Sequence, residues 1–340
     1  MRQAERDPES WKRLVLGSSP RPAWLSDDAP HVDVVLSSRT RVMRNLVGHR
    51  FPNGATVGEL QDVMRQVLDA ARDADLALDT FKGLTNAERD HLVACRLVSP
   101  DFEWTLPGRA LLVDARRSLS VMVNEEDHLR IQSLSAGWSV SASDAEARAC
   151  LDALSSRLPF SFSPEFGYLS ASPFNCGSGR RRSAMFHLIG LAQSKRLPAV
   201  LTALSAMGVS VRGLFGESSR AIGAFVQVSV LELAQTEFAG ACEYLLREER
   251  ESRTLVPRET LTEKSTQARD FAVSSRSLSL ADALRVLAWI RWASVSSLPG
   301  FPSSPRAADA ALTTLDIRGT MGEEHAARQR ADALRAALGA

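Results

Sequence analysis

The sequence predicts an α+β fold over its first 253 residues and an all-helical region after them. Three observations support this prediction. Valine-rich or alternating segments, which are typical of strands, recur between residues 31 and 233, with amphipathic helical segments among them. A short polar turn joins two of the predicted strands into a hairpin. Beyond residue 254 the apolar residues follow helical spacing.

Composition and charge narrow the class of protein. The 340 residues, 44% of them hydrophobic, suffice for one large domain with an appendage or for two domains. The 41 basic and 40 acidic residues nearly cancel, which argues against a global attraction to nucleic acid or to an acidic membrane. We find neither a signal peptide nor a run of roughly 18 apolar residues. Four scattered cysteines without a CxxC pair favour a reducing, cytoplasmic location: Cys95, Cys150, Cys176 and Cys242.

The N-terminal third is predicted to contain an arm, strands and one helix. Residues 1–30 are polar and proline-containing, as in an extended arm, and HVDVVLSS, residues 31–38, predicts a strand. TVGELQDVMRQVLDAARDA, residues 56–74, has apolar residues at helical spacing behind a threonine cap. ALLVDARRSLSVMVN, residues 110–124, predicts two strands joined by a tight turn at residues 114–117.

The middle third repeats this mixture. Strands are predicted for GYLSASP, VSVRGLF and AFVQVSVLEL, which cover residues 167–173, 209–215 and 224–233. SAMFHLIGLAQ and LPAVLTALSAMG, residues 183–193 and 197–208, predict two helices separated at a proline.

A charge-laced surface helix is predicted from near Gln235, and a change of composition follows it. Residues 254–270 have few large apolar residues and a proline, which makes this segment the predicted domain boundary. Residues 279–295 and 321–338 predict further helices. We therefore predict an arm over 1–30, a main domain over 31–253 and a helical domain over 254–340.

Five arginines lie at predicted strand ends or in turn-like segments. Each alone is typical of a solvated surface charge. Arg39 and Arg41 are two apart on a strand, however, so their side chains project from the same face. Guanidinium groups offer paired donors to phosphate, and the sequence contains no GxxxxGK[ST] loop that would hold phosphates by its backbone. The candidates for phosphate binding are Arg39, Arg41, Arg130, Arg181 and Arg212.

Acidic residues are concentrated in two places. The segment NEED, residues 124–127, directly follows a predicted strand, and Glu217 lies in the polar loop GESSRAIG. The simpler interpretation of the first is a solvated strand end, and that of the second is an ordinary mobile loop.

Four ordered motifs resemble the ATP:guanido phosphotransferase (phosphagen kinase) family. DVVLSSRTRVMRNLVGHRFP is similar to its SSRxRxxRN…FP pattern, and SVMVNEEDHLRIQ is similar to its NEEDHxR motif. FGYLSASPFNCGSGRRRSAMFHL resembles GYLTxCPTNxGTGxRxSxMLHL, and VRGLFGESSRAIGAFVQVS resembles VRGxxGExSEAxGxxxQIS. The resemblance spans residues 33–229 and implies a phosphagen-kinase-type catalytic domain over residues 31–253, with an antiparallel β-sheet flanked by helices.

The position of the motifs favours the bacterial protein arginine kinase branch, of the McsB type. Small-molecule kinases of the family carry a helical domain ahead of SSRxR, whereas this motif begins here at Ser37. ARDFAVSSRSLSLADALRVLAWIRW, residues 268–292, is also similar to the C-terminal region of that branch. The resemblance therefore implies transfer of the γ-phosphoryl group of ATP to arginine side chains of proteins, with Mg²⁺.

The resemblance also implies a role for each candidate residue. The five arginines match nucleotide-phosphate arginines, Glu126 and Glu217 match two guanidinium-binding carboxylates, and Glu125 would reach magnesium through water. A guanidinium has a pKa above about 12, so carboxylates must orient the planar cation and accept its proton. Loop residues implied to line the substrate site are Ser172, Asn175, Ser218 and Ser219.

This sequence departs from the family pattern at four places. Ser172 replaces the CPTN cysteine, Arg220 replaces the acid of GExSEA, and Val230-Leu231 replaces an asparagine-glutamine pair. The RDxxRA motif that reads phosphoarginine in McsB-type proteins aligns with AARQRA, residues 326–331, which keeps only its last two residues. We therefore predict a structural packing role for this helix.

Two other functions remain open from the sequence. One is a kinase of free arginine or another small guanidino compound, and the other is a degenerate adaptor pseudokinase that binds client proteins. Retention of all five arginines and both glutamates argues against the adaptor. For partners, the resemblance suggests protein substrates bearing arginine, a zinc-containing activator and a Clp ATPase or protease that degrades the marked proteins, and it leaves a homodimer open.

Overall fold

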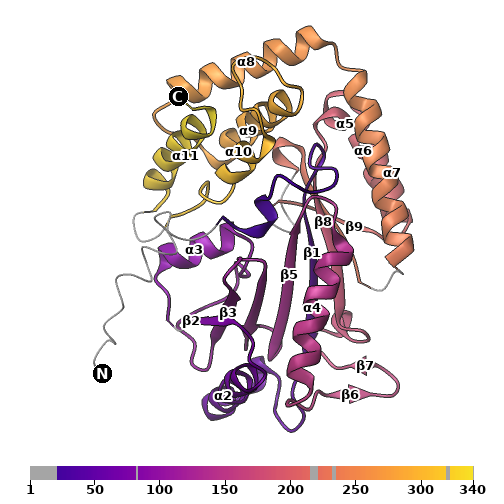
Figure 1. Ribbon diagram of the computed structural model, residues 1–340, viewed down its shortest axis with the longest axis vertical. Helices are drawn as coiled ribbons and strands as arrows, with labels where there is room; N and C mark the ends of the chain where they lie inside the picture. The colour runs from indigo at the N-terminus through magenta and orange to yellow at the C-terminus, as the bar shows by residue number, and fades with distance from the viewer. Residues whose placement is uncertain (1–20, 82, 215–220, 232–234, 319–321, 340) are drawn as a thin grey trace.

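An eight-stranded antiparallel sheet forms the centre of the structure, a computed structural model that describes residues 21–81, 83–214, 221–231, 235–318 and 322–339. Its strand order is β2-β3-β4-β5-β1-β8-β10-β9, and the short strands β6 and β7 form a separate hairpin (Figure 1). The strands are β1 (Val35–Arg44), β2 (Leu78–Phe81), β3 (Ala110–Asp114), β4 (Leu119–Val123), β5 (Leu129–Ala136), β6 (Phe162–Ser163), β7 (Gly167–Tyr168), β8 (Arg180–His187), β9 (Ser210–Gly213) and β10 (Phe225–Val230).

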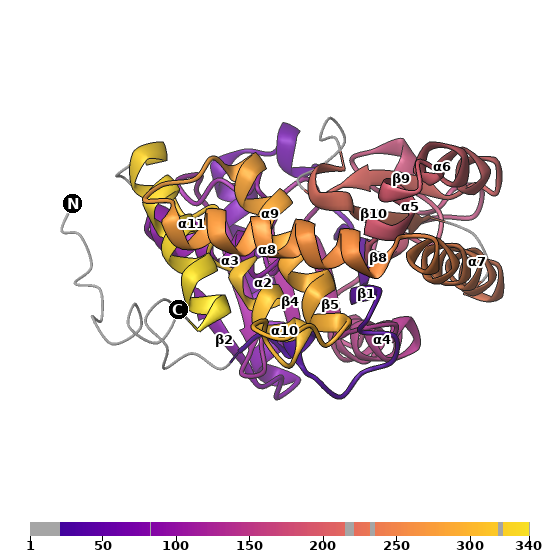
Figure 2. The same ribbon diagram turned by 90° about the horizontal axis from the view of Figure 1, so that it is seen from above.

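Helices surround this sheet, and α8 to α11 lie over its upper end, as the view from above shows (Figure 2). The α-helices are α2 (Val57–Asp73), α3 (Asn86–Ala94), α4 (Val140–Ser155), α5 (Ile189–Gln193), α6 (Leu197–Ala206), α7 (Gln235–Thr254), α8 (Arg258–Ser274), α9 (Leu280–Val295), α10 (Pro305–Ala311) and α11 (Gly322–Leu338). The 3₁₀ helices are η1 (Ala23–Leu25), η2 (Pro52–Gly54), η3 (Pro173–Asn175) and η4 (Ile222–Ala224).

One face of the sheet is covered by α2, α4 and α7. Val42 on β1 and Ile131 on β5 pack with Val63 of α2 in one apolar cluster. Phe186 on β8 packs with Phe238 of α7 in a second cluster. These residues occupy alternate positions of their strands, so the intervening side chains point to the opposite face.

The opposite face is divided between a packed half and a polar half. Leu134 on β5, Met185 on β8 and Phe225 on β10 belong to the apolar cluster that also contains Leu284 of α9. The C-terminal helices therefore cover the upper part of this face. Its lower part keeps polar side chains, and this part positions the candidate site.

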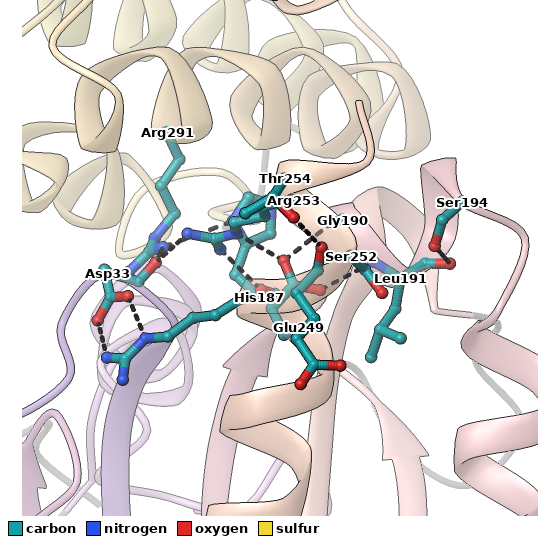
Figure 3. Close-up of polar contacts among 12 residues, drawn as sticks. Asp33, His187, Gly190, Leu191, Ser194, Glu249, Ser252, Arg253, Thr254 and Arg291 are labelled. Carbon is teal, nitrogen blue, oxygen red and sulfur yellow. Dashed lines mark hydrogen bonds and ion pairs between the residues drawn. The ribbon is translucent and has the colours of Figure 1, made fainter. Parts of the chain in front are cut away.

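A buried ionic network joins the C-terminal helices to the sheet (Figure 3). Arg291 of α9 is fully buried, and its Nε donates a hydrogen bond of 2.7 Å to Asp309. Its other nitrogens donate to the carbonyl oxygens of Val32 and Asp33, at 2.6 and 2.9 Å. Arg306 donates to the second oxygen of Asp309 at 2.9 Å. Because paired buried charges tolerate little displacement, the network fixes α9 and α10 against the start of β1.

A second part of the same network ties α7 to the end of β8. Glu249 accepts hydrogen bonds of 2.9 Å from the backbone of Gly190 and Leu191, at the start of α5, and pairs with Arg253 at 2.7 Å. Arg253 also donates to the carbonyl oxygen of His187 at 3.2 Å. Burial, with the nearby charges of Arg291 and Arg253, lowers the pKa of His187 well below its ordinary value. His187 is therefore a core histidine.

Most predicted elements are confirmed. The capping box between Thr56 and Glu59 opens α2, and the predicted hairpin forms from β3 and β4 with its turn at residues 114–117. Helices α6, α7, α9 and α11 and strands β9 and β10 also lie where the patterns placed them. Two predicted strands differ in length from the observed ones. β1 extends past its predicted end to Arg44, and the strand predicted over 167–173 is limited to Gly167–Tyr168.

The helix predicted over residues 183–193 is wrong. Residues 180–187 form β8, and the helix α5 begins only at Ile189. The reason is that β8 is buried on both faces, with Phe186 under α7 and Met185 under α9. A strand buried on both sides lacks the apolar-polar alternation that distinguishes it from a buried helix.

The described part of the predicted arm is packed. Trp24 of η1 is 0% exposed, and its indole nitrogen donates to the carbonyl oxygen of Cys95 at 3.1 Å. Residues 1–20 lie outside the described part. Among the described helices, none combines the length and apolar character that crossing a membrane requires.

Candidate active site

The strand register gathers arginines from four strands on one face of the sheet. Arg41 on β1 pairs with Arg181 on β8 and with Gln132 on β5, so these three side chains share a face. Arg130 lies two residues from Gln132 on β5 and points the same way. The register of β10 brings Arg212 of β9 to this face too.

A cavity of about 500 Å³ lies at this cluster. Its lining combines arginines from the sheet with carboxylates from the turn between β4 and β5 and with residues of the segment around η3. The lining residues are Arg41, Met43, Glu125, Glu126, Asp127, Arg130, Ser172, Phe174, Asn175, Arg181, Ser210, Arg212 and Leu231.

Arg41 is a buried cation at the centre of this cluster. Burial lowers the pKa of Arg41 well below its ordinary value, and the charges of neighbouring arginines, Arg39 first, lower it further. Among the described residues its Nε finds no hydrogen-bond partner. Crowded guanidinium groups of this kind are unfavourable by themselves and become favourable when an anion lies among them.

Arg39 lies on the same face as Arg41 but beside the cavity, outside its lining. Its Nη2 donates to Oε1 of Gln227 at 2.8 Å, and its Nε donates to the hydroxyl of Ser183 at 3.4 Å. Burial, followed by the charges of Arg130 and other arginines, lowers the pKa of Arg39 to about 9. It is thus part of the cationic cluster while being held by side chains of β8 and β10.

A tight turn holds the acidic residues at the edge of the cavity. Asn124 adopts a φ of +56°, and its backbone nitrogen donates to the carbonyl oxygen of His128 at 3.0 Å. Asparagine tolerates this left-handed conformation better than most residues. The Asn124 side chain donates to the carbonyl oxygens of Leu60 and Gly108, at 2.8 and 2.7 Å. These hydrogen bonds fix the conformation of the turn.

Glu125 and Glu126 lie in different electrostatic environments. Burial raises the pKa of Glu125, but the charge of Arg130 and hydrogen bonds from Arg130 and Ser99 outweigh it, so the net pKa is lowered. Burial also raises the pKa of Glu126, and the charges of Asp127 and Glu125 raise it further. Glu125 is therefore held as an anion, while Glu126 has the higher proton affinity that a proton acceptor needs.

Asp127 connects the acidic turn to the segment that carries η3. Its carboxylate accepts hydrogen bonds from Asn45 at 2.6 Å, from the Ser170 hydroxyl at 2.8 Å and from the backbone nitrogen of Ala171 at 2.8 Å. The adjacent His128 is fully buried, and its Nδ1 accepts from the backbone nitrogen of Leu46 at 3.0 Å. The side chains of Asp127 and His128 therefore stabilise the conformation of the turn.

The structure brings most predicted site residues together. Glu125, Glu126, Arg41, Arg130, Arg181 and Arg212 line one cavity with Ser172 and Asn175, while Arg39 lies beside it. The remaining predicted site residues lie outside the described residues, so their roles stay predictions: Glu217, Ser218 and Ser219, together with Arg220.

Several residues of this region were not predicted from the sequence, including Gln227, Asp127 and Phe174. Gln227 binds Arg39, Asp127 anchors the loop, and Phe174 lines the cavity. Alternation along FVQVSV places Gln227 on the face opposite its valines, which was an available signal. A phenylalanine inside the polar segment SPFNCGSG was another. The partners of Asp127 are distant in sequence and gave no such signal.

The donor set of the cavity fits magnesium that is shared with a nucleotide. Mg²⁺ prefers oxygen ligands, keeps several waters and commonly takes one or two carboxylates plus substrate phosphates. Glu125 and Glu126 supply carboxylates at the cavity. In the described part of the chain, no group of three or more histidine, cysteine or acidic residues forms a metal cage. Any metal here would therefore depend on phosphate oxygens and water.

Comparison with known families agrees with this geometry. The profile of the ATP:guanido phosphotransferase C-terminal catalytic domain matches residues 59–239. The chain belongs to the ATP:guanido phosphotransferase family.

Curated relatives identify the branch. The protein named "Protein-arginine kinase" of Halothermothrix orenii is 34% identical over 285 residues, which cover 79% of this chain and 80% of the relative. That of Moorella thermoacetica is 35% identical over 285 residues, which cover 79% and 81%. The predicted resemblance to the protein arginine kinase branch is confirmed.

Solved structures confirm the fold class. Lombricine kinase superimposes with a TM-score of 0.58 at 22% identity, covering 71% of this chain and 74% of that one. The duplicated taurocyamine kinase of Schistosoma mansoni, with bound transition state analog components, gives a TM-score of 0.59 at 21% identity and covers 68% and 35%. At these identities the likeness concerns the fold alone.

The degenerate motif over residues 326–331 is part of the helical core. Arg330 is fully buried and donates to the carbonyl oxygen of Leu315 at 2.6 Å and to Asp316 at 3.1 Å. It also pairs with Glu323 at 2.5 Å. A guanidinium engaged in this way serves packing, which agrees with the structural role predicted for this helix.

Proposed function

We propose that this chain is a protein arginine kinase that transfers the γ-phosphoryl group of ATP to the guanidinium groups of arginine side chains in proteins. The observation that carries the proposal is the cavity in which a cationic cluster from four strands meets the carboxylates of one rigid turn. The names of the curated relatives support the same substrate.

The first chemical requirement is an oriented and deprotonated acceptor. A guanidinium is a poor nucleophile while it is protonated. Glu126 would hold one edge of the planar cation, direct a terminal nitrogen toward the γ-phosphate and accept its proton as the N–P bond forms. Its raised pKa suits this role, because a base of higher proton affinity removes a proton more readily.

The second requirement is a phosphate site that stabilises charge. Arg41, Arg130, Arg181 and Arg212 would contact the nucleotide phosphates, with Arg39 supporting the cluster from beside the cavity. Mg²⁺, when bound here, would supply positive charge against the negative charge that develops during transfer. Glu125 would contact the metal through water. Alignment and charge stabilisation of this kind supply most of the catalysis in phosphoryl transfer.

Glu217 is proposed as the second carboxylate that grips the acceptor. It lies in the sequence segment GESSRAIG, outside the described residues, and its role rests on the resemblance to the family motif.

Mass spectrometry tests the proposal directly. The protein is incubated with ATP, Mg²⁺, an unfolded protein and free arginine, and phosphoarginine is measured on both acceptors. We expect phosphoarginine on the protein, formed about 100-fold or more slowly by a matched Glu126→Gln variant. Phosphorylation of free arginine alone would instead establish a small-guanidino kinase. Binding of clients without phosphorylation of either acceptor would establish an adaptor pseudokinase, the alternative that the four departures from the family pattern support.

We also propose the partners that this branch implies: a zinc-containing activator protein, a Clp ATPase or protease that degrades the marked proteins, and a second copy of the chain. A cytoplasmic location accords with them. Co-purification of the tagged protein from its own cells, followed by mass spectrometry, tests each partner.

A further inference from the structure

Phe174 is an unusually exposed apolar side chain at the candidate active site. It is 84% exposed, more than any other large apolar residue in the described part of the chain. It nevertheless lines the same cavity as Glu126 and Arg41. An exposed aromatic group beside a catalytic cavity is typical of a surface that contacts a partner or substrate.

The segment around Phe174 is rigid. At its start, the backbone of Ala171 donates to Asp127 at 2.8 Å. At its end, Gly177 exchanges two backbone hydrogen bonds with Tyr168 of β7, at 2.8 and 3.2 Å. Between these anchors the 3₁₀ helix η3 begins with Pro173. Because the backbone that carries Phe174 is fixed in this way, binding through this residue costs little backbone conformational entropy.

Packing gives no reason for an aromatic residue at this position. None of the three apolar clusters formed by the described residues includes Phe174. The segment SPFNCGSG is otherwise composed of small and polar residues apart from its proline. The family pattern that it resembles has threonine at this place. The aromatic ring is therefore a feature of this chain that the fold does not require.

A second exposed apolar element adjoins the same segment. Phe162 and Phe166 of the β6–β7 hairpin are 59% and 58% exposed. The backbones of the hairpin and of the Phe174 segment lie in close contact at Gly167 and Gly177. A Cβ atom built on Gly167 would lie only 2.7 Å from Cα of Gly177, so a larger residue would not fit there. Phe166 directly precedes Gly167. Two further exposed phenylalanines thus lie on the hairpin that adjoins the Phe174 segment.

We propose that Phe174 is a specificity-determining residue that packs against an apolar side chain flanking the target arginine of a protein substrate. The inference rests on the proposed function. An arginine that reaches Glu126 carries its neighbouring residues across the cavity wall, and residues of an extended chain are only about 3.3 Å apart. Residues within two positions of the arginine therefore meet Phe174.

This contact selects one class of acceptor. Apolar residues are exposed in unfolded proteins and buried in folded ones, so arginines next to apolar residues become available mainly when a client unfolds. Free arginine and other small guanidino compounds have no flanking residue and gain nothing from Phe174. The occupant of this surface is therefore an unfolded segment with an apolar residue beside its arginine.

Paired acceptor peptides test the inference. One peptide carries a single arginine flanked by leucines, and the other carries the same arginine flanked by serines. The readouts are the ratio of kcat/KM for the two peptides and the ratio of their dissociation constants in the presence of a non-hydrolysable ATP analogue. For the unsubstituted protein we expect a preference of about tenfold for the leucine peptide, which is the scale of one buried apolar contact.

Three variants make the test specific. Phe174→Ser should bring both ratios close to one, whereas Phe174→Leu should keep most of the preference. Phe271→Ser, at an exposed phenylalanine of α8, is the matched surface control and should leave the ratios as they are. Unchanged ratios in Phe174→Ser, or equal losses for both peptides, would overturn the inference.

The two readouts separate this inference from the proposed function. Loss of the binding preference in Phe174→Ser supports the inference even if no phosphoarginine forms on either peptide. The absence of phosphoarginine would overturn only the proposed function. Phosphorylation of both peptides with no preference in the unsubstituted protein overturns the inference and leaves the proposed function standing.

Discussion

Arg130 donates a hydrogen bond of 2.7 Å to Glu125 inside the cavity, and both side chains are largely buried. The pair joins a residue proposed to bind phosphate to one proposed to reach magnesium. In the absence of nucleotide, Arg130 and Glu125 pair their opposite charges. A bound phosphate must therefore compete with Glu125 for Arg130.

Substitution Glu125→Gln should therefore change nucleotide and metal binding in opposite directions. Mg²⁺-free ATP should bind several-fold more tightly, because Arg130 loses its internal anion. The Mg²⁺ concentration for half-maximal activity should rise about tenfold, because one carboxylate is lost from the metal site. Calorimetric titration of ATP with and without Mg²⁺ measures both effects. Weaker binding of Mg²⁺-free ATP would show that Glu125 does not compete with phosphate.

Glu126 predicts the pH dependence of turnover. A general base works deprotonated, so kcat should fall as the pH drops through the pKa of Glu126. Burial and the charges of Asp127 and Glu125 raise that pKa, so the acid limb should lie above the ordinary glutamate value of about 4.3. Glu125→Gln removes one of these charges and should move the limb to lower pH. A limb at or below the ordinary value would argue against Glu126 as the base.

Removal of Glu126 should separate chemistry from nucleotide binding. In Glu126→Gln the kcat should fall about 100-fold or more, the usual range for losing a general base, while the dissociation constant for ATP stays within about twofold. Arg39→Ala should do the reverse and raise the KM for ATP. Steady-state kinetics and equilibrium binding on both variants provide the comparison, and near-normal turnover in Glu126→Gln would reject its assignment.

The arginine cluster should destabilise the folded protein when no nucleotide is bound. Arg41 is buried among like charges, so Arg41→Met should raise the free energy of unfolding of the nucleotide-free protein by about 1 kcal/mol. The same variant should bind ATP at least tenfold more weakly. Urea denaturation with and without ATP measures both. Arg72→Met, on the exposed side of α2, is the control and should change stability by less than about 0.5 kcal/mol.

The Asp309 carboxylate should be essential for holding the C-terminal helices on the sheet (Figure 3 shows Arg291, one of its partners). Asp309→Ala leaves Arg291 and Arg306 without their shared anion and should destabilise the protein by about 3–5 kcal/mol. Denaturation and limited proteolysis of residues 280–311 provide the measurement. Asp270→Ala, at an exposed acid of α8, should have little effect. Equal stability of the two variants would show that the network is not needed for docking.

The sequence by itself determined the family, the candidate residues and most of the elements. Motif residues named the arginines and the carboxylates, and periodicity with capping signals located α2, the β3–β4 hairpin and α9. These features are local, since capping, turn formation and alternation depend on residues a few positions apart. The helix predicted over 183–193 was wrong because burial of β8 on both faces depends on distant helices.

Only the tertiary structure decided how the candidate residues meet. The register of β1 between β5 and β8 places Arg41 opposite Arg181, and Asp127 fixes the Phe174 segment beside Glu126 through partners 43 and 44 residues away. It also placed Arg39 beside the cavity and left Phe174 exposed at its wall. Strand register and burial result from pairing and packing between segments far apart in the chain, which no local pattern specifies.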